Sequence, residues 1–476
     1  QFLYDYKGKK YKVFGPDDAD ALKLLKRFLK IIFVSADVKG FKISKKRITT
    51  DMGYKLIKVS SENRLTWIKK NFDLSETIYM GDGIYDHLIM KKVFYWSPFI
   101  SKVATIKAVI NSAEAINKFS KKNKYSSTII DAINEWSDYY KILKDKDIDV
   151  VHLNKGSILN LKKKDGFLIS RLIYWYIFIR SFFSLNNLLK QEKPDYLIVH
   201  LITSLPLILF IINNYETKLV LRISGLPKMT FLRRQLWKLA YKKIFKITCP
   251  TRDTLNDLSK FEFLKEKLIV LNDPVLNIKD IQNSKKIDVN INRKVKEIVE
   301  NKKFLLSIGR FTKQKNFLFF LKSIPEIIKS NKELYFLFIG TGEEKEKFLV
   351  TLNKLGVSDK VYTLDYSNNV HYFMEKSEAL ILTSLWEDPG FVLIEAGYNN
   401  CQVVSSNCPN GPKEIIGENG GYLFESNSKE SLIKTINNCL KDSSNERLTK
   451  KIYLKKKIKT FTSFYHANEL LREVLI

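Results

Sequence analysis

The feature that most constrains the fold is a short apolar run followed by two spaced glutamates. Residues 379–383 are continuously apolar up to a terminal Thr, a pattern typical of a buried parallel strand. After Gly390 the apolar residues recur at helical spacing, so Glu387 falls in a strand-to-helix loop and Glu395 in the first turns of a helix. Ligands bind at this edge of open α/β sheets, and the free N–H groups of the helix favour an anion there. Two carboxylates so placed suit the vicinal hydroxyls of a sugar or ribose.

Four ordered motifs between residues 306 and 421 carry a family resemblance. Residues 384–396 resemble the Glu-x7-Glu signature of the retaining glycosyltransferases of family 4, which have the GT-B fold. The resemblance continues through residues 407–416 and 418–421, and upstream through 306–316. The alternative is a generic Rossmann-like half in which Glu387 and Glu395 are merely solvated.

The resemblance implies a role for individual residues. Glu395 would hold the ribose hydroxyls and Glu387 the donor sugar, while Arg310 and Lys315 would neutralise the diphosphate leaving group. Main-chain groups of Gly390 and Phe391 would hold the sugar or a phosphate. Val392, Gly309 and Gly340 are expected to belong to the donor site as well. No cofactor and no metal is implied for sugar transfer.

The first part of the chain contains a second set of polar strand ends. The β-rich runs 31–35 and 77–80 alternate with helical patterns, which predicts a βα domain. The first run ends at Ser35, and the second leads to Asp82 and Asp86. Carboxylates at such an edge suit Mg²⁺, and a hydroxyl suits a phosphate oxygen. The alternative is that both aspartates only cap a helix.

With residues 4–14, these segments resemble the haloacid-dehalogenase phosphatases, closest to those acting on Kdo 8-phosphate. The implied phosphate and metal site is Ser35, Arg64, Asp82 and Asp86, with Asp82 as a ligand of Mg²⁺. Arg64 replaces the family's Lys, which keeps the charge but changes its geometry. The family's nucleophilic Asp-x-Asp would precede Gln1, so we expect a truncated domain without phosphatase activity in residues 1–476.

The predicted fold class is α/β: two Rossmann-like GT-B halves preceded by a partial haloacid-dehalogenase-like domain. A length of 476 residues is consistent with three domains. The expected boundaries are 1–136 for the first domain, 140–285 for the acceptor-side half, and 290–476 for the donor-side half with a terminal helix that crosses back. Residues 105–145 are interpreted as the end of the first domain and a linker. The first strand and Gly-rich loop of the acceptor half are not recognisable before the strand at 148–153.

Residues 196–215 carry no formal charge, which raises the question of a membrane span. Thr203, Ser204 and Pro206 in the middle favour a strand, a loop and a buried helix instead. His200, at the end of the predicted strand, is a candidate acceptor-side residue; the alternative is a histidine satisfied by a backbone partner.

The formal net charge of +30 calls for an acidic partner. In residues 233–246, cationic side chains flank Trp237 and other apolar residues, a composition that suits an anionic membrane surface; a plain surface helix is the alternative. No nucleic-acid-binding motif is recognisable, so nucleic acid is not expected as a partner. The four cysteines lack paired spacing, which indicates reduced thiols in the cytoplasm. The expected location is cytoplasmic, peripheral on the inner face of the cell membrane.

The predicted function is retaining transfer of a sugar from a nucleotide-sugar donor to a bacterial surface polysaccharide or a lipid-linked glycan. One alternative is a sugar-phosphate phosphatase with an accessory transferase domain. The other is a non-catalytic basic scaffold associated with a membrane.

Overall fold

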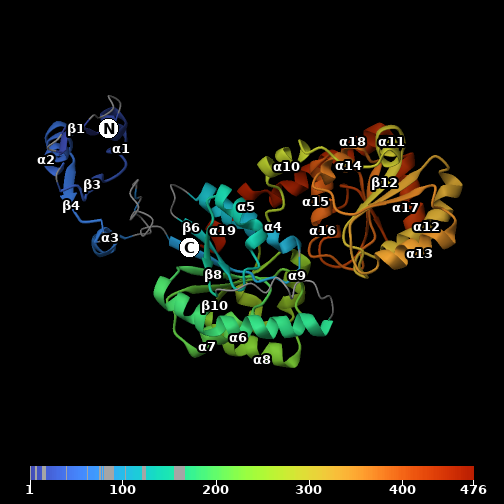
Figure 1. Ribbon diagram of the computed structural model, residues 1–476, viewed down its shortest axis with the longest axis horizontal. Coiled ribbons are helices and arrows are strands. Elements are labelled where there is room, and N and C mark those ends of the chain that lie inside the picture. The colour runs from blue at the N-terminus through green and yellow to red at the C-terminus, as the bar shows by residue number, and fades with distance from the viewer. Residues whose placement is uncertain are drawn as a thin grey trace. The chain divides into compact units, whose positions relative to one another are not determined.

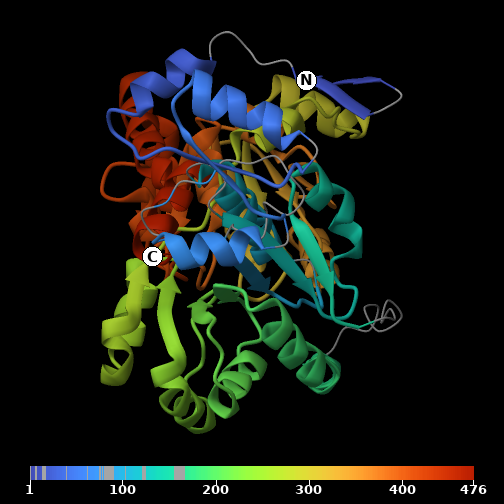
Figure 2. The ribbon, with the colours of Figure 1, turned by 90° about the vertical axis from the view of Figure 1, so that its left-hand side faces the viewer.

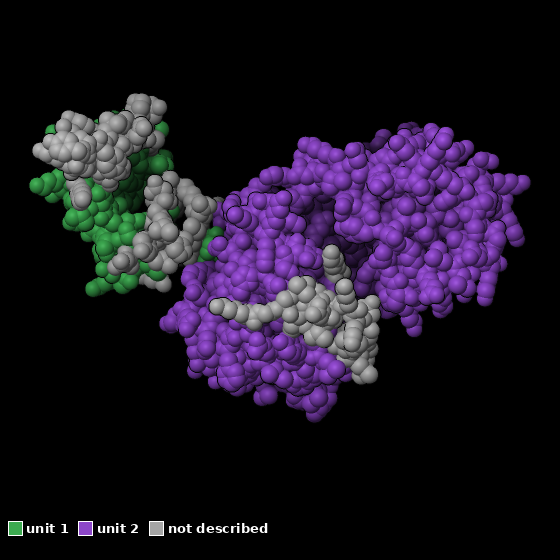
Figure 3. Space-filling view, in the orientation of Figure 1, with its two compact units in different colours: residues 1–91, 121–126 green, residues 92–120, 127–476 purple. Residues whose placement is uncertain are grey.

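The computed structural model describes residues 2–5, 8–12, 18–38, 40–61, 63–73, 77, 79, 91–101, 103–120, 125–154 and 167–475. The chain divides into two compact units, residues 1–91 with 121–126 and residues 92–120 with 127–476 (Figure 3). Each unit is described by itself.

The first unit contains two small sheets. Strands β1 (Phe2–Asp5) and β2 (Gly8–Lys12) pair antiparallel, and α1 (Asp18–Leu25) follows. Strands β3 (Ile32–Ser35) and β4 (Lys55–Lys58) pair in parallel, and the connection between them holds α2 (Phe41–Lys45) and a π-helical turn, Lys46–Asp51. Helix α3 (Arg64–Asn71) comes next. Of the strand predicted at 77–80, only residues 77 and 79 are described.

The second unit begins with a seven-stranded sheet of order β11-β10-β9-β8-β5-β6-β7 (Figure 1). The strands are β5 (Lys91–Trp96), β6 (Tyr125–Asp131), β7 (Asp149–His152), β8 (Tyr196–Val199), β9 (Lys218–Arg222), β10 (Ile244–Cys249) and β11 (Leu268–Val270). Strand β8 pairs in parallel with both β5 and β9. The chain order reverses between β5 and β8, which makes this point the topological switch of the sheet.

The boundary predicted between the first domain and the acceptor half is corrected. Strands β5 and β6 belong to this sheet, and α4 (Ala104–Phe119) between them contributes buried residues, so the half begins near residue 91 and not at 140. The missing first strand is β5. It was not recognised because it opens with two lysines, and because the loop after it, Ser97 to Val103, contains no glycine.

The helices of the acceptor half fall into two groups. One group shares a hydrophobic core with the sheet: α6 (Phe167–Glu192), α7 (Ser204–Ile212), α8 (Phe231–Ala240) and α9 (Arg252–Ser259). The other group consists of α4, α5 (Tyr140–Asp145) and the C-terminal helix α19 (Ser463–Glu473). Helix α4 packs against α19, and α5 precedes β7. Residues 196–215 form β8, a loop and the buried α7, and no helix in the described part of the chain is long and apolar enough to cross a membrane.

The donor half is built on a six-stranded parallel sheet of order β14-β13-β12-β15-β16-β17. Its strands are β12 (Phe304–Ile308), β13 (Tyr335–Ile339), β14 (Val361–Leu364), β15 (Ala379–Leu382), β16 (Val403–Ser406) and β17 (Tyr422–Phe424). Helices α12 (Phe317–Ser330), α13 (Lys345–Leu355) and α17 (Lys429–Lys441) share one core with the sheet. Helices α11 (Arg293–Asn301), α14 (Val370–Lys376), α15 (Phe391–Tyr398), α16 (Pro412–Ile416) and α18 (Ser444–Lys457) share the other.

The chain passes between the two halves twice, and the two passages are bonded to each other. The Leu276 N–H donates to the carbonyl of Phe461 at 3.0 Å, and the Ser463 N–H donates to the carbonyl of Leu276 at 3.2 Å. After the second passage α19 packs on α4, so the predicted terminal helix that crosses back is present.

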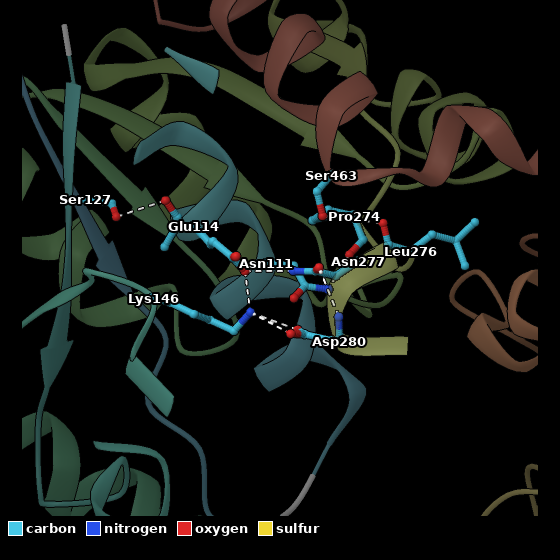
Figure 4. Close-up of polar contacts among 10 residues, drawn as sticks. Asn111, Glu114, Ser127, Lys146, Pro274, Leu276, Asn277, Asp280 and Ser463 are labelled. Carbon is cyan, nitrogen blue, oxygen red and sulfur yellow. Dashed lines mark hydrogen bonds and ion pairs between the residues drawn. The ribbon is translucent and has the colours of Figure 1, made fainter. Parts of the chain in front are cut away.

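A polar network fixes the first passage to the acceptor half (Figure 4). The Lys146 ammonium lies 2.8 Å from the Asp280 carboxylate and also contacts Glu114. The Asn277 amide donates to Glu114 at 2.7 Å, and the Asn111 amide donates to the Pro274 carbonyl at 2.7 Å. Asp280 lies on α10 (Ile278–Lys285), whose last residue forms an ion pair with Glu375 of the donor half. Helix α10 is therefore held by both halves.

Candidate active site

The centre of the candidate site is Glu387, in the loop after β15. Its side chain is buried, with 3% of the residue exposed, and it has two partners at the same oxygen. The Lys315 ammonium and the Ser384 hydroxyl each donate to Oε1 at 2.5 Å. The backbone N–H of Glu387 donates to the Pro409 carbonyl at 3.1 Å. The carboxylate therefore has a fixed orientation and a neighbouring positive charge.

Arg310 and Lys315 both lie in the loop after β12, next to β15 in the sheet. Arg310 is exposed, whereas Lys315 is largely covered and points to Glu387. The loop is supported by the end of β13, where Gly340 has a φ of 149° and a Cβ would lie 1.8 Å from the Gly309 carbonyl oxygen. Only glycine fits at this position, because the two strand ends meet backbone to backbone.

Helix α15 begins at the same sheet edge. Gly390, with φ of 103°, caps its N-terminus, and Phe391 and Val392 are its first residues. The first turn of a helix has N–H groups without intrahelical partners, and these favour an anionic ligand. The structure thus brings together at one edge the residues predicted for the donor: Arg310, Lys315, Glu387, Glu395, Gly309, Gly340, Gly390, Phe391 and Val392.

Glu395 on α15 has a partner that sequence reasoning missed. The Lys107 ammonium, from α4 in the acceptor half, lies 2.8 Å from Oε1 of Glu395. Attraction to Glu395 raises the pKa of Lys107 above its usual value, against the opposing effect of burial. No local pattern pointed to Lys107, because the two residues are 288 positions apart.

Asp388 is a second residue that sequence reasoning passed over. The Leu226 N–H, from the loop after β9, donates to Oδ1 of Asp388 at 3.3 Å, so this contact also joins the two halves. Burial raises the pKa of Asp388 to about 6, and the neighbouring charge of Glu387 adds to the rise. Its position directly after Glu387 was the only available signal.

His200, the acceptor-side candidate, lies at the end of β8 and is 3% exposed. Its Nδ1 is 3.1 Å from the Ser224 hydroxyl, and its backbone N–H donates to the Trp96 carbonyl. Burial lowers the pKa of His200 well below its usual value. The side chain lines a small cavity of about 10 Å³ beside the buried Arg222–Asp273 ion pair.

The carboxyl ends of β6 and β7 hold a polar cluster that sequence analysis did not identify. Asp131, the last residue of β6, contacts the Tyr140 hydroxyl and lies 3.5 Å from Nδ1 of His152, the last residue of β7. Glu135 is fully buried and accepts the N–H groups of Ala132 and Ile133, and burial raises its pKa well above the usual value. Polar residues at both strand ends were the missed signal.

The predicted phosphate site of the first unit is described only in part. The Ser35 hydroxyl, at the end of β3, accepts the Asp37 N–H at 3.3 Å, and the Arg64 guanidinium donates to the Tyr79 hydroxyl at 3.0 Å. Asp82 and Asp86 lie outside the described residues. Within the described residues, no group of three or more His, Cys, Asp or Glu side chains could hold a metal ion.

Comparison with known proteins agrees with the geometry of the donor half. Residues 288–455 match the family model described as glycosyl transferases group 1. An uncharacterized glycosyltransferase of Methanocaldococcus jannaschii is 27% identical over 262 residues, 52% of this chain and 63% of that protein. The N-acetylgalactosamine-N,N'-diacetylbacillosaminyl-diphospho-undecaprenol 4-alpha-N-acetylgalactosaminyltransferase of Campylobacter jejuni is 26% identical, over 55% of this chain and 69% of its own length. The chain thus spans less than two thirds of the archaeal relative.

Solved structures show the same fold. Anabaena HepE, in complex with UDP and glucose, has a TM-score of 0.60 at 14% identity and covers 81% of this chain and 99% of its own. A glycosyltransferase from Rickettsia africae has a TM-score of 0.63 at 14% identity and covers 80% and 97%. Residues 288–455 are therefore a glycosyl transferases group 1 domain, and the chain has the fold of these solved glycosyltransferases.

Proposed function

We propose that this chain transfers a sugar, with retention at the anomeric carbon, from a nucleotide-sugar donor to a bacterial surface polysaccharide or a lipid-linked glycan. The observation that carries the proposal is the buried Glu387 carboxylate, oriented by Lys315 and Ser384 beside the start of α15. A fixed carboxylate can accept hydrogen bonds from sugar hydroxyls. The neighbouring cation and the helix N-terminus can bind a diphosphate at the same time.

The chemistry assigned to the site is stabilisation of the leaving group. Arg310 and Lys315 supply positive charge where the diphosphate departs, and the first N–H groups of α15 supply further donors. Glu395 accepts hydrogen bonds from the ribose hydroxyls and Glu387 from the donor sugar. In this assignment the protein's own cations perform the charge neutralisation, and no metal is required for transfer.

A lipid-linked acceptor is favoured by the names of two relatives. The Campylobacter protein is named for a diphospho-undecaprenol-linked acceptor. A UDP-Gal:alpha-D-GlcNAc-diphosphoundecaprenol alpha-1,3-galactosyltransferase of Escherichia coli is 26% identical over 54% of this chain and 69% of its own length. We assign the acceptor to the acceptor half, where the exposed His152 at the end of β7, oriented by the buried Asp131, can meet glycan hydroxyls.

The first unit is proposed as the haloacid-dehalogenase-like part. Ser35 at the end of β3 and Arg64 at the start of α3 are candidates for its phosphate and metal site, together with Asp82 and Asp86. Asp82 is the candidate ligand of Mg²⁺. These assignments rest on the sequence resemblance.

The test is a transfer assay with a panel of nucleotide sugars and an undecaprenyl-diphosphate-linked acceptor. We expect transfer with one donor, loss of transfer in Glu387→Gln, and unchanged transfer in Glu346→Gln, an exposed carboxylate of the same half. NMR of the product reports the anomeric configuration. An inverted product would overturn retention, and equal rates in the two variants would overturn the site.

A further inference from the structure

The outer face of α6 is an exposed apolar stripe. Leu172, Trp175, Ile179 and Phe183 are 62–73% exposed, and Tyr176 between them is 39% exposed. The spacing of four, three and four from residue 172 through 176 and 179 to 183 places these side chains on one side of the helix. The other side of α6 faces the core, where Ile173, Ile177, Leu185 and Leu189 are buried.

Helix α8 presents a similar outer face. Phe231, Leu232 and Leu239 are 71–79% exposed, and Lys238 and Lys242 are exposed among them. Trp237, which the sequence suggested as a membrane-facing residue, is instead 1% exposed and packs into the core with Ala240. The apolar side chains of α8 that are available for contact with a partner are therefore those of Phe231, Leu232 and Leu239.

The two outer faces belong to one helix layer. Helix α7 contacts both α6 and α8, and the green and yellow-green helices of this layer lie together at the bottom of Figures 1 and 2. We call the exposed apolar residues of α6 and α8, together with Arg171, Arg180, Lys238 and Lys242, the α6–α8 surface.

The charge around this surface is predominantly positive. Residues 201–250 contain nine Lys or Arg and a single acidic residue, Glu216. On α6, Arg171 precedes the stripe and Arg180 lies within it, between Ile179 and Phe183. A binding partner must therefore accept apolar side chains and cations at the same time.

We propose that the α6–α8 surface docks on an anionic lipid bilayer. Aliphatic and aromatic side chains insert at the boundary between headgroups and acyl chains, and Lys and Arg meet the anionic headgroups. A second copy of the chain is disfavoured by its net charge of +30, and residues 1–91 are basic as well, with 19 Lys or Arg against 11 Asp or Glu. Docking places the acceptor half at the membrane. This deepens the proposed lipid-linked acceptor, but it does not depend on the transfer reaction.

The first test is co-sedimentation with phosphatidylcholine vesicles, with and without phosphatidylglycerol. We expect binding only to the anionic vesicles, and weaker binding as the salt concentration rises. The Ile179→Ser/Phe183→Ser variant should bind about tenfold less or worse, because two inserted apolar groups are lost. The matched control is Leu448→Ser/Ile452→Ser, an exposed apolar pair at the same spacing on α18 of the donor half, which should bind like the wild type.

A second measurement tests insertion directly. Quenching by bromine-labelled lipid should reach Trp175, and Trp175→Phe should remove most of that quenching. Transfer activity toward a soluble acceptor should be equal in wild type and the Ile179→Ser/Phe183→Ser variant, so failure of docking and failure of the transferase assignment are distinguishable. Equal vesicle binding by the two double-serine variants would overturn the proposal. So would a wild-type dimer that the α6 variant converts to a monomer, since the surface would then join two copies.

Discussion

The Lys107 ammonium lies 2.8 Å from the Glu395 carboxylate, and this ion pair connects α4 of the acceptor half with α15 of the donor half. Glu395 is the residue assigned to the ribose hydroxyls. In this structure its carboxylate already has a cationic partner, so a bound ribose has to share or replace that partner.

Replacing Lys107 with methionine should strengthen donor binding. The substitution keeps the aliphatic stem but removes the charge that competes for Glu395. Because the pair is partly exposed, the expected gain is modest, about twofold to fivefold in Kd by calorimetry. Lys118→Met, at the other end of α4, is the matched control. Weaker donor binding in Lys107→Met would mean instead that Lys107 contacts the donor itself.

Replacing Glu395 with alanine should weaken nucleotide-sugar binding and leave the protein folded. Removing a carboxylate that accepts two hydroxyl hydrogen bonds should cost about 1.5–3 kcal/mol of binding free energy for each bond. Calorimetry measures the loss, and thermal unfolding checks the fold. An unchanged donor Kd would reject the ribose assignment. If Lys107 and Glu395 interact as observed, the Lys107→Met gain should also disappear in the Glu395→Ala background.

Arg310→Ala and Lys315→Ala should each lower turnover by about a hundredfold or more, because each removes charge that stabilises the leaving diphosphate. Their effects on stability should differ. Lys315→Ala leaves the buried Glu387 without its ammonium partner and should cost about 1–3 kcal/mol, whereas Arg310 is exposed and its loss should cost much less. Turnover and urea unfolding measure the two effects. Rates within twofold of wild type would contradict the role.

The donor half was predictable because its signals are local. The strand at 379–382, the loop with Glu387 and the helix from Phe391 follow each other directly in sequence, and the structure has them in that order. The same holds for β12 with Arg310 and for β13 with Gly340. A strand, its loop and its helix are specified by neighbouring residues, so the pattern can be recognised in the sequence without knowledge of the tertiary structure.

The contacts between the halves were not predictable in this way. Lys107 meets Glu395 across 288 residues, and Leu226 meets Asp388 across 162. Strand β5 was missed because two lysines precede its apolar residues and no glycine follows. Trp237 was assigned to the surface from composition, although its spacing of three to Ala240 places both residues on one face of α8, the face that is buried.

Replacing Asp388 with asparagine should change the pH dependence of stability. Burial raises the pKa of Asp388 from 3.8 to about 6, so the folded protein binds this proton more tightly than the unfolded chain does. The stabilising contribution of the neutral carboxyl is complete below the unfolded pKa and is lost as pH rises through about 6. Above that pH the partly buried carboxylate costs at most about 3 kcal/mol.

Asparagine removes this cost, and its side-chain oxygen can still accept the Leu226 N–H. The melting temperature of Asp388→Asn should therefore exceed that of wild type at about pH 8, and the difference should shrink toward pH 4. Asp359→Asn, an exposed aspartate in the same half, is the control. An equal difference at both pH values would show that Asp388 is not a buried proton-binding group at the junction of the halves. A lower melting temperature at pH 8 would show that its negative charge stabilises the junction.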